Sequence, residues 1–268
     1  MQIDVRGQST YLYTGGKKLT PLTVDREKTI IFIHGAQQDH SCWTLQTRWF
    51  AHHGFTVLAP DLPGHGRSAG EPLQSVEALA EWIAALLDAL GVEQARLVGH
   101  SMGSLVAVEF AATYPQRTVQ AALIGTSLPM PVAPVLLDAA RDNEPKAATM
   151  INGWSYSASG QIGGNTVPGL WLLGMNQRLM ARQKPGVFHA DLAACNAYGR
   201  SLESLSAITA PVLLIAGSQD KMTSPKVAKA VQAAIPGAQM SLVPGSGHAL
   251  MAERPDAVLD ALIAFLAR

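Results

Sequence analysis

Runs of consecutive apolar residues, each about as long as a strand, recur along the chain and alternate with stretches of amphipathic character. A continuous apolar run indicates a strand that is covered on both faces, as in a parallel sheet. Two shorter segments at the start, separated by a turn at Gly7-Gln8, predict an antiparallel hairpin. The expected strands are residues 3–5, 10–13, 29–33, 56–59, 95–98, 119–124, 212–216 and 240–243.

Apolar residues at helical spacing between these runs predict amphipathic helices. Gly91 follows the first of them, at the place where a glycine commonly ends a helix. Because strands and helices alternate, the sequence predicts an α/β fold with a mostly parallel eight-stranded sheet and helices on both faces. The expected helices of this core are residues 76–90, 101–114, 224–235 and 255–267.

The alternation stops in the middle of the chain. Three prolines open this stretch, helical patterns follow, and no strand candidate occurs there. We therefore expect a helical cap, residues 127–205, inserted over the strand ends of a core formed by residues 1–126 and 206–268. A glycine-rich passage within the cap fits a mobile loop as well as an ordered turn. The helical patterns cover residues 135–141, 169–182 and 190–198, and the glycine-rich passage covers residues 153–169.

Charge and composition exclude several classes of protein. Lys and Arg total 20 and Asp and Glu total 20 among 268 residues, so the formal net charge is zero. Nucleic acids and anionic membranes attract a basic face, so neither is expected as a partner. Hydrophobic residues make up 48% and charged residues 15%, against about 25% charged in a typical domain, which indicates a folded chain rather than a disordered one.

Signals for export or membrane insertion are not visible. The chain lacks a basic start followed by an apolar run, and no apolar stretch approaches the 18 or so residues that cross a bilayer. Two cysteines, Cys42 and Cys195, are too few for a disulfide framework and have no metal-type partner at short spacing. We expect a cytoplasmic protein with two ordinary buried thiols and no metal.

One short motif has the composition of a nucleophile turn. Gly99-His100-Ser101-Met102-Gly103 matches G-x-S-x-G, with a strand-like segment before it and a helix-like segment after it. The two glycines are needed because a side chain at either position would collide with the neighbouring strand or helix. The helix that follows directs its N-terminal amides toward charge developing near the Ser101 hydroxyl.

A serine hydroxyl is a weak nucleophile at neutral pH, so it needs a base, and the base needs an acid to orient it. In this topology the three should occur in the order serine, acid, histidine, each just beyond a strand. His248 is the one histidine of eight that lies in the loop after the last expected strand, and Asp220 follows the strand before it. The loop after residues 119–124 has no carboxylate before Asp138, which makes Asp220 the better candidate.

The loop after residues 29–33 is the candidate oxyanion hole. Gly35 lets the backbone turn its amides inward, and we expect the N–H groups of Ala36 and Met102 to hold the oxyanion.

Five elements stand in a fixed order: His34-Gly35, Asp61-Leu62-Pro63-Gly64-His65-Gly66-Arg67-Ser68, the turn at Ser101, Gly217 to Asp220, and Gly247-His248. Together they resemble the α/β-hydrolase family over nearly the whole chain, which implies the α/β-hydrolase fold. By this resemblance Ser101 is the nucleophile, His248 the general base and then acid, and Asp220 the residue that orients it. The resemblance also implies a structural role for the segment 61–68.

Several methionines and tryptophans of the expected cap would form an apolar, adaptable pocket wall. This favours an ester with a hydrophobic acyl or alcohol part over a sugar or a highly charged substrate. The residues expected to bind substrate are Gln37, from the oxyanion loop, and Trp154, Trp171 and Met175, from the cap.

The sequence thus predicts a serine hydrolase that cleaves a small-molecule carboxylic ester through an acyl-enzyme, without a cofactor, as a monomer or homodimer. Carbon–carbon bond hydrolysis, enol-lactone hydrolysis and acyl transfer stay open with the same triad. Carbon–carbon hydrolases usually have a Gly/Pro-rich oxyanion loop and an Asn before the serine, where this chain has Gln37-Gln38 and His100. Dehalogenases and epoxide hydrolases need an Asp nucleophile, which Ser101 excludes. In a non-enzymatic alternative, the cap closes over a small ligand without turnover.

Overall fold

The structure, a computed structural model, describes residues 1–167 and 169–267, so Pro168 and Arg268 lie outside the described residues. It is built on an eight-stranded sheet with the order β1-β2-β4-β3-β5-β6-β7-β8. β1 pairs antiparallel with β2, β2 pairs antiparallel with β4, and the later pairs are parallel. The strands are β1 (Gln2–Val5), β2 (Gln8–Tyr13), β3 (Thr29–Ile33), β4 (Thr56–Pro60), β5 (Ala95–His100), β6 (Thr118–Ile124), β7 (Val212–Gly217) and β8 (Gln239–Val243).

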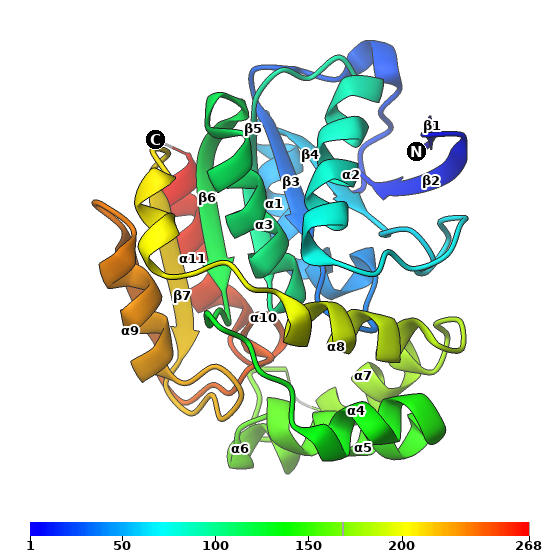
Figure 1. Ribbon diagram of the computed structural model, residues 1–268, viewed down its shortest axis with the longest axis vertical. Coiled ribbons are helices and arrows are strands. Elements are labelled where there is room, and N and C mark those ends of the chain that lie inside the picture. Colours follow the sequence, from blue (N-terminus) through cyan, green and yellow to red (C-terminus); the bar gives the residue numbers. More distant parts are fainter. Residues whose placement is uncertain (168, 268) are drawn as a thin grey trace.

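Helices cover both faces of the sheet (Figure 1). In β3, Ile31 and Ile33 belong to the apolar cluster that includes residues of α2, α3 and α9, whereas Ile30 and Phe32 belong to a second cluster with residues of α1 and α11. Alternate side chains of a strand point to opposite faces, so a strand covered on both sides must be apolar throughout. The core helices are α1 (Thr44–His52), α2 (Val76–Ala89), α3 (Met102–Thr113), α9 (Pro225–Ala234), α10 (Leu250–Glu253) and α11 (Pro255–Leu266), with short 3₁₀ turns at Pro21–Thr23, His40–Trp43, Pro115–Arg117 and Glu203–Ala207.

The remaining helices lie between β6 and β7 in the chain and gather at the end of the sheet where β6 and β7 finish (Figure 1). All of these helices except α6 share an apolar cluster of their own, which includes Leu136, Ile151, Phe188 and Leu192. In the glycine-rich passage, residues 153–155 end α5, residues 158–161 form the short helix α6, and turns follow up to residue 167. These helices are α4 (Pro134–Asp142), α5 (Glu144–Ser155), α6 (Ala158–Gln161), α7 (Leu172–Met180) and α8 (Val187–Ala197). We keep the name cap for residues 127–205, whose exact bounds stay a prediction.

The predicted fold class is confirmed, and every expected strand is present. Four helices lie outside the ranges expected from the apolar pattern: the short α6 and α10, and the longer α1 and α5. The buried positions of α1 include Gln46 and Thr47, and those of α5 include Asn152 and Ser155. Because polar residues occupy part of the buried face, the apolar periodicity that predicts a helix is weak in both α1 and α5.

Among the residues that the structure describes, no helix combines the length and the apolar character that crossing a bilayer requires.

Candidate active site

Ser101 occupies the sharp turn between β5 and α3. Its backbone has φ 51° and ψ −119°, a conformation that is strained for a residue with a side chain. The flanking glycines permit the turn, because a Cβ on Gly99 would overlap the carbonyl of Gly103, and a Cβ on Gly103 would overlap that of Ile33. The turn places the half-buried Ser101 side chain at the N-terminus of α3, where the helix dipole favours negative charge.

His248 lies in the loop after β8, and the cap fixes its backbone. The amides of His248 and Ala249 both donate to the carbonyl of Ser155, at the end of α5, over 2.7 and 3.0 Å. The ring Nδ1 lies 2.8 Å from Oδ2 of Asp220. The ring Nε2 is buried and has no hydrogen-bond partner among the described residues. This arrangement presents Nε2 as a free proton acceptor, as a general base requires.

Asp220 follows β7 and is held by four donors. Its Oδ1 accepts the amides of Met222 and Thr223 at 2.8 Å each, and its Oδ2 accepts the Thr223 hydroxyl at 2.7 Å as well as His248. Burial alone would raise the pKa of this carboxyl. The charge and hydrogen bond of His248, with the hydrogen bonds of Thr223, outweigh burial and lower the pKa to about 2. Asp220 therefore remains an anion that orients His248 throughout the neutral range.

His100 braces the His248 loop. Its Nε2 lies 2.9 Å from the carbonyl oxygen of His248. Since a carbonyl only accepts, Nε2 carries the proton and Nδ1 is bare. Burial, and then the nearby charge of His248, lower the pKa of His100 to about 3, so the ring is neutral. His100 therefore holds the backbone of the His248 loop by a hydrogen bond.

The loop after β3, residues 34–38, is called here the oxyanion loop. His34 Nδ1 donates to the carbonyl of Gly35 over 2.9 Å, and His34 Nε2 accepts the amide of Leu62 over 3.1 Å. Burial and the neighbouring His65 lower the pKa of His34 to about 4, so it is neutral. Within residues 1–167 and 169–267, the amides of Ala36 and Met102 donate to no protein acceptor. Both N–H groups are thus available for an oxyanion.

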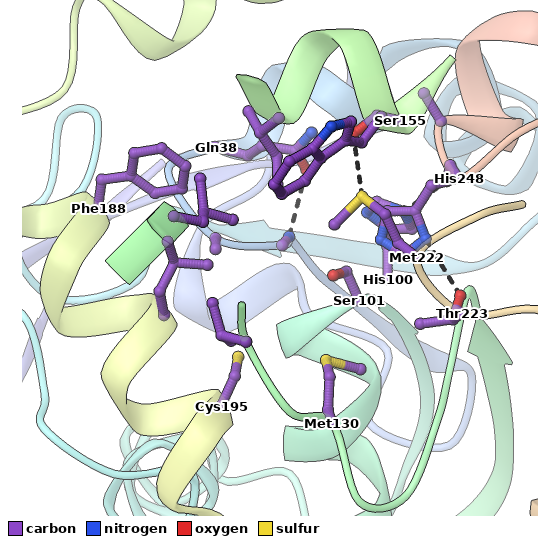
Figure 2. A pocket seen from close by; sticks show the side chains of 18 of the residues that line it. Gln38, His100, Ser101, Met130, Ser155, Phe188, Cys195, Met222, Thr223 and His248 are labelled. Carbon is purple, nitrogen blue, oxygen red and sulfur yellow. Dashed lines mark hydrogen bonds between the residues drawn. The ribbon is translucent and has the colours of Figure 1, made fainter. Parts of the chain in front are cut away.

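A cavity of about 440 Å³ opens onto these groups. Figure 2 shows Ser101, His100, His248 and Thr223 on one side of it and Phe188 and Cys195, both from α8, on the other. Most of its wall is apolar and comes from the cap, both from its helices and from the segment 130–133 that precedes α4. These apolar lining residues are Met130, Pro131, Val132, Ala133, Leu136, Ile151, Trp154, Met180, Phe188, Leu192 and Cys195.

Of the four residues expected to bind substrate, Trp154 lines the cavity and the other three do not. Gln37 is turned away, because its Nε2 donates to the carbonyl of Met180 over 3.2 Å. Trp171 and Met175 are 63% and 47% exposed on the outer surface of the cap. Tryptophan and methionine are usually buried, but residue type alone does not show which face of a cap helix is turned toward the cavity.

Other lining residues had no place in the sequence-based site. Gln38 accepts the amide of Gly35, Met222 accepts a weak hydrogen bond from Ser155, and Thr223 bonds to both Asp220 and His248. Thr223 alone carries a local signal, because a hydroxyl three residues after an aspartate commonly closes a turn on it.

A cluster of Asp39, His40 and Asp61 has the composition of a metal site. Its oxygens are already engaged, however. Asp39 pairs with Arg182 and Ser41, and Asp61 accepts the amide and Nδ1 of His40, at 2.8 and 2.7 Å. The cluster thus joins the turn at residues 39–41 to Asp61 and to Arg182 of the cap, and its described oxygens offer no vacant ligand set.

Comparisons with known proteins identify the family of the chain. The model of the alpha/beta hydrolase family matches residues 30–261. A 2-hydroxy-6-oxo-6-phenylhexa-2,4-dienoate hydrolase from Burkholderia cepacia is 29% identical over 255 residues, which are 90% of this chain and 88% of that protein. The enol-lactonase from Burkholderia xenovorans LB400 has a TM-score of 0.87 at 23% identity and covers 100% of both chains. A thermophilic esterase from Thermogutta terrifontis has a TM-score of 0.85 at 23% identity, over 100% of this chain and 98% of that one. At this identity the two structures establish the fold, and the family model establishes the family. The chain therefore belongs to the alpha/beta hydrolase family and is a hydrolase.

Proposed function

We propose that the protein hydrolyses carboxylic esters of small to medium, largely apolar substrates, with Ser101, His248 and Asp220 as its catalytic triad. The observation that carries the proposal is the chain of groups from an ionised Asp220 through His248 to a free Nε2, in a cavity that also holds Ser101. No cofactor is needed for this chemistry.

The reaction begins when Ser101 Oγ attacks the ester carbonyl carbon and its proton passes to His248 Nε2. The amides of Ala36 and Met102 donate to the oxyanion, while Asp220 stabilises the imidazolium. The tetrahedral intermediate then collapses, the C–O bond breaks, and Nε2 gives its proton to the departing alcohol. Water attacks the acyl-enzyme along the same route, releases the acid, and returns the proton to Ser101.

The cavity wall supports an apolar acyl or alcohol group. Its side chains are mostly aliphatic, aromatic or sulfur-containing, and Lys221, which is exposed, is the only charged lining residue among those that the structure describes. A volume of about 440 Å³ is within the range of pockets that take small ligands.

The test is hydrolysis of p-nitrophenyl esters from acetate to decanoate. We expect an optimum of acyl length in the wild type and a loss of at least about 10⁴-fold in kcat in Ser101→Ala. Ser206→Ala, at an exposed serine, is the matched control and should retain full activity. Turnover by Ser101→Ala, or failure of a fluorophosphonate to label Ser101 in the folded wild type, would overturn the proposal.

A second candidate, hydrolysis of a carbon–carbon bond, is favoured by the Burkholderia cepacia relative, whose substrate combines a phenyl ring with a carboxylate. Here the ring would occupy the apolar wall and the carboxylate would meet Lys221. The discriminating experiment compares that dienoate with p-nitrophenyl esters in wild type and Lys221→Met. Faster turnover of the dienoate than of any ester, with a loss confined to the dienoate in Lys221→Met, would favour the second candidate.

A further inference from the structure

Gln37 is the strained residue of the oxyanion loop, and the cap holds it in place. Its φ is +56°, in the left-handed region that non-glycine residues rarely adopt. Its amide donates to Oδ2 of Asp191, on α8, over 2.8 Å, and its side chain donates to the carbonyl of Met180, at the end of α7. A strained backbone conformation persists only where surrounding interactions hold it. Here the acceptors of both the main-chain and the side-chain hydrogen bond of Gln37 belong to the cap.

Asp191 also binds His65, from the segment 61–68 of the core. His65 Nε2 lies 2.8 Å from the same Oδ2, and His65 Nδ1 lies 2.9 Å from the carbonyl of Pro63. Both ring nitrogens therefore donate, and the ring is an imidazolium. Asp191 and His65 are each 1% exposed, so this is a fully buried ion pair between cap and core. Burial lowers the pKa of His65, but the charge and hydrogen bond of Asp191 outweigh it and raise the pKa.

The hydrogen bond to Asp191 acts on one of the two peptide planes that flank Ala36. The plane between Ala36 and Gln37 is fixed by the Gln37 amide on Asp191. The plane between Gly35 and Ala36 contains the Ala36 N–H itself, and its carbonyl is fixed by His34 and by the amide of Gln38. Because each peptide unit is planar, fixing both units determines the direction in which the Ala36 N–H points.

We propose that Asp191 is a positioning residue, through which the seated cap holds the Ala36 amide in the geometry of the oxyanion hole. The proposal rests on the proposed function, since it concerns the same hole. The cap then does two things: it walls the substrate cavity, and it completes the oxyanion hole only when α8 lies against the oxyanion loop.

A second buried contact between cap and core supplies a matched control. Glu109, on α3, accepts Arg200 at 2.6 and 2.8 Å and the hydroxyl of Tyr198 at 2.7 Å, just beyond α8. Among the described residues, its side chain forms no hydrogen bond or ion pair with the oxyanion loop. Glu109→Gln should weaken this second contact and leave the hydrogen bond between Asp191 and Gln37, and with it the position of Ala36, intact.

The experiment compares wild type, Asp191→Asn and Glu109→Gln. The readouts are kcat and KM for the best p-nitrophenyl ester and the second-order rate at which a fluorophosphonate labels Ser101. In Asp191→Asn we expect kcat to fall about 10- to 100-fold with KM within about threefold, because the hole is misplaced while the apolar wall is kept. The labelling rate should fall in parallel, since the phosphonyl oxygen uses the same hole. Glu109→Gln should lower the unfolding free energy with kcat within about twofold.

Two results would overturn the inference: an Asp191→Asn protein with unchanged kcat and labelling rate, or equal losses of kcat in Asp191→Asn and Glu109→Gln. If Asp191→Asn fails to fold, Asp191→Glu keeps the buried charge pair and shifts its oxygens by one methylene, and the same loss of kcat and labelling rate is expected. The labelling rate needs no ester, so it tests this inference even if every ester fails as a substrate and the proposed function falls.

Discussion

The core and the cap contribute to the site in different ways. The core holds the three proposed catalytic residues on loops at one edge of the sheet, namely Ser101 after β5, Asp220 after β7 and His248 after β8. The cap provides the apolar wall and also two acceptors that hold loops of the core: the Ser155 carbonyl accepts the His248 amide, and Asp191 accepts the Gln37 amide of the oxyanion loop. The difference teaches that a lid over a pocket can also be part of the scaffold that orients the catalytic groups.

The largest effect in this comparison is expected on the core side, from Asp220→Asn. The neutral side chain of Asn cannot stabilise the imidazolium of His248. Its NH₂ group would also replace an oxygen that accepts a hydrogen bond; where it faces His248 Nδ1, it favours the tautomer with the proton on Nε2, which cannot act as the base. We expect kcat to fall about 10³- to 10⁴-fold with KM little changed. The measurement is steady-state kinetics on the best ester, with fluorophosphonate labelling as a check that the site is formed. A loss below about tenfold would show that another carboxylate serves as the acid.

The core could be predicted from sequence because its signals are local. A few neighbouring residues suffice to predict the strand β3 from its apolar run and the turn at Ser101 from its glycines. The order of Ser101, Asp220 and His248 along the chain follows from the order of the strands. What holds these groups could not be predicted. The hydrogen bond from Gln37 to Asp191 joins residues 154 positions apart, and no sequence pattern around either residue indicates that the two are in contact.

The same limit explains the substrate-binding residues. Trp154 and Trp171 have identical chemistry and both belong to the cap, yet one lines the cavity and the other lies on the surface. Their orientation depends on how α5 and α7 pack, and on polar buried positions such as Asn152 that hide the periodicity of α5. The expectation that Gln37 faces substrate failed for a related reason, since the cap competes for its amide group.

Glu253→Gln should have a smaller effect than Asp220→Asn, because it weakens a contact that joins the cap to the His248 loop. Glu253 is 1% exposed; its Oε1 accepts the amide and hydroxyl of Ser157, and its Oε2 accepts the amide of Gly247 over 2.6 Å. Exchanging one oxygen for NH₂ leaves a buried donor unsatisfied, which costs about 1–3 kcal/mol of unfolding free energy. We expect a fall in kcat of about tenfold with it. Urea denaturation and kinetics measure both, with the exposed Asp138→Asn as control. Full stability in Glu253→Gln would mean that the cap does not need this contact.

A smaller effect sharpens the distinction between the two tryptophans. Trp154→Ala enlarges the apolar wall, so KM should rise by about 3- to 10-fold for short acyl chains and the optimum should move to longer ones. Trp171→Ala removes an exposed side chain and should change KM by less than about twofold. The chain-length profile of p-nitrophenyl esters measures both variants. Equal effects of the two substitutions would place Trp171 in the path of the substrate.

The smallest effect is expected in the pH dependence of the unfolding free energy. The pair of Asp220 and His248 within the core should respond at low pH, and the pair of His65 and Asp191 between core and cap should respond at high pH. The pKa of Asp220 is lowered to about 2, so its contribution is present above its ordinary value near 4 and is lost as the pH falls through 2. The pKa of His65, which faces Asp191, Asp61 and His34, is raised, so its contribution is complete below about 6.5 and is lost as the pH rises through the raised value. Urea denaturation of wild type and Asp191→Asn at about pH 6 and about pH 9 tests the cap side. The stability difference between the two proteins should narrow at the higher pH, because the imidazolium that Asp191 stabilises has then lost its proton. A difference that stays constant over this range would mean that the pair between cap and core contributes through its hydrogen bonds alone and not through its charge.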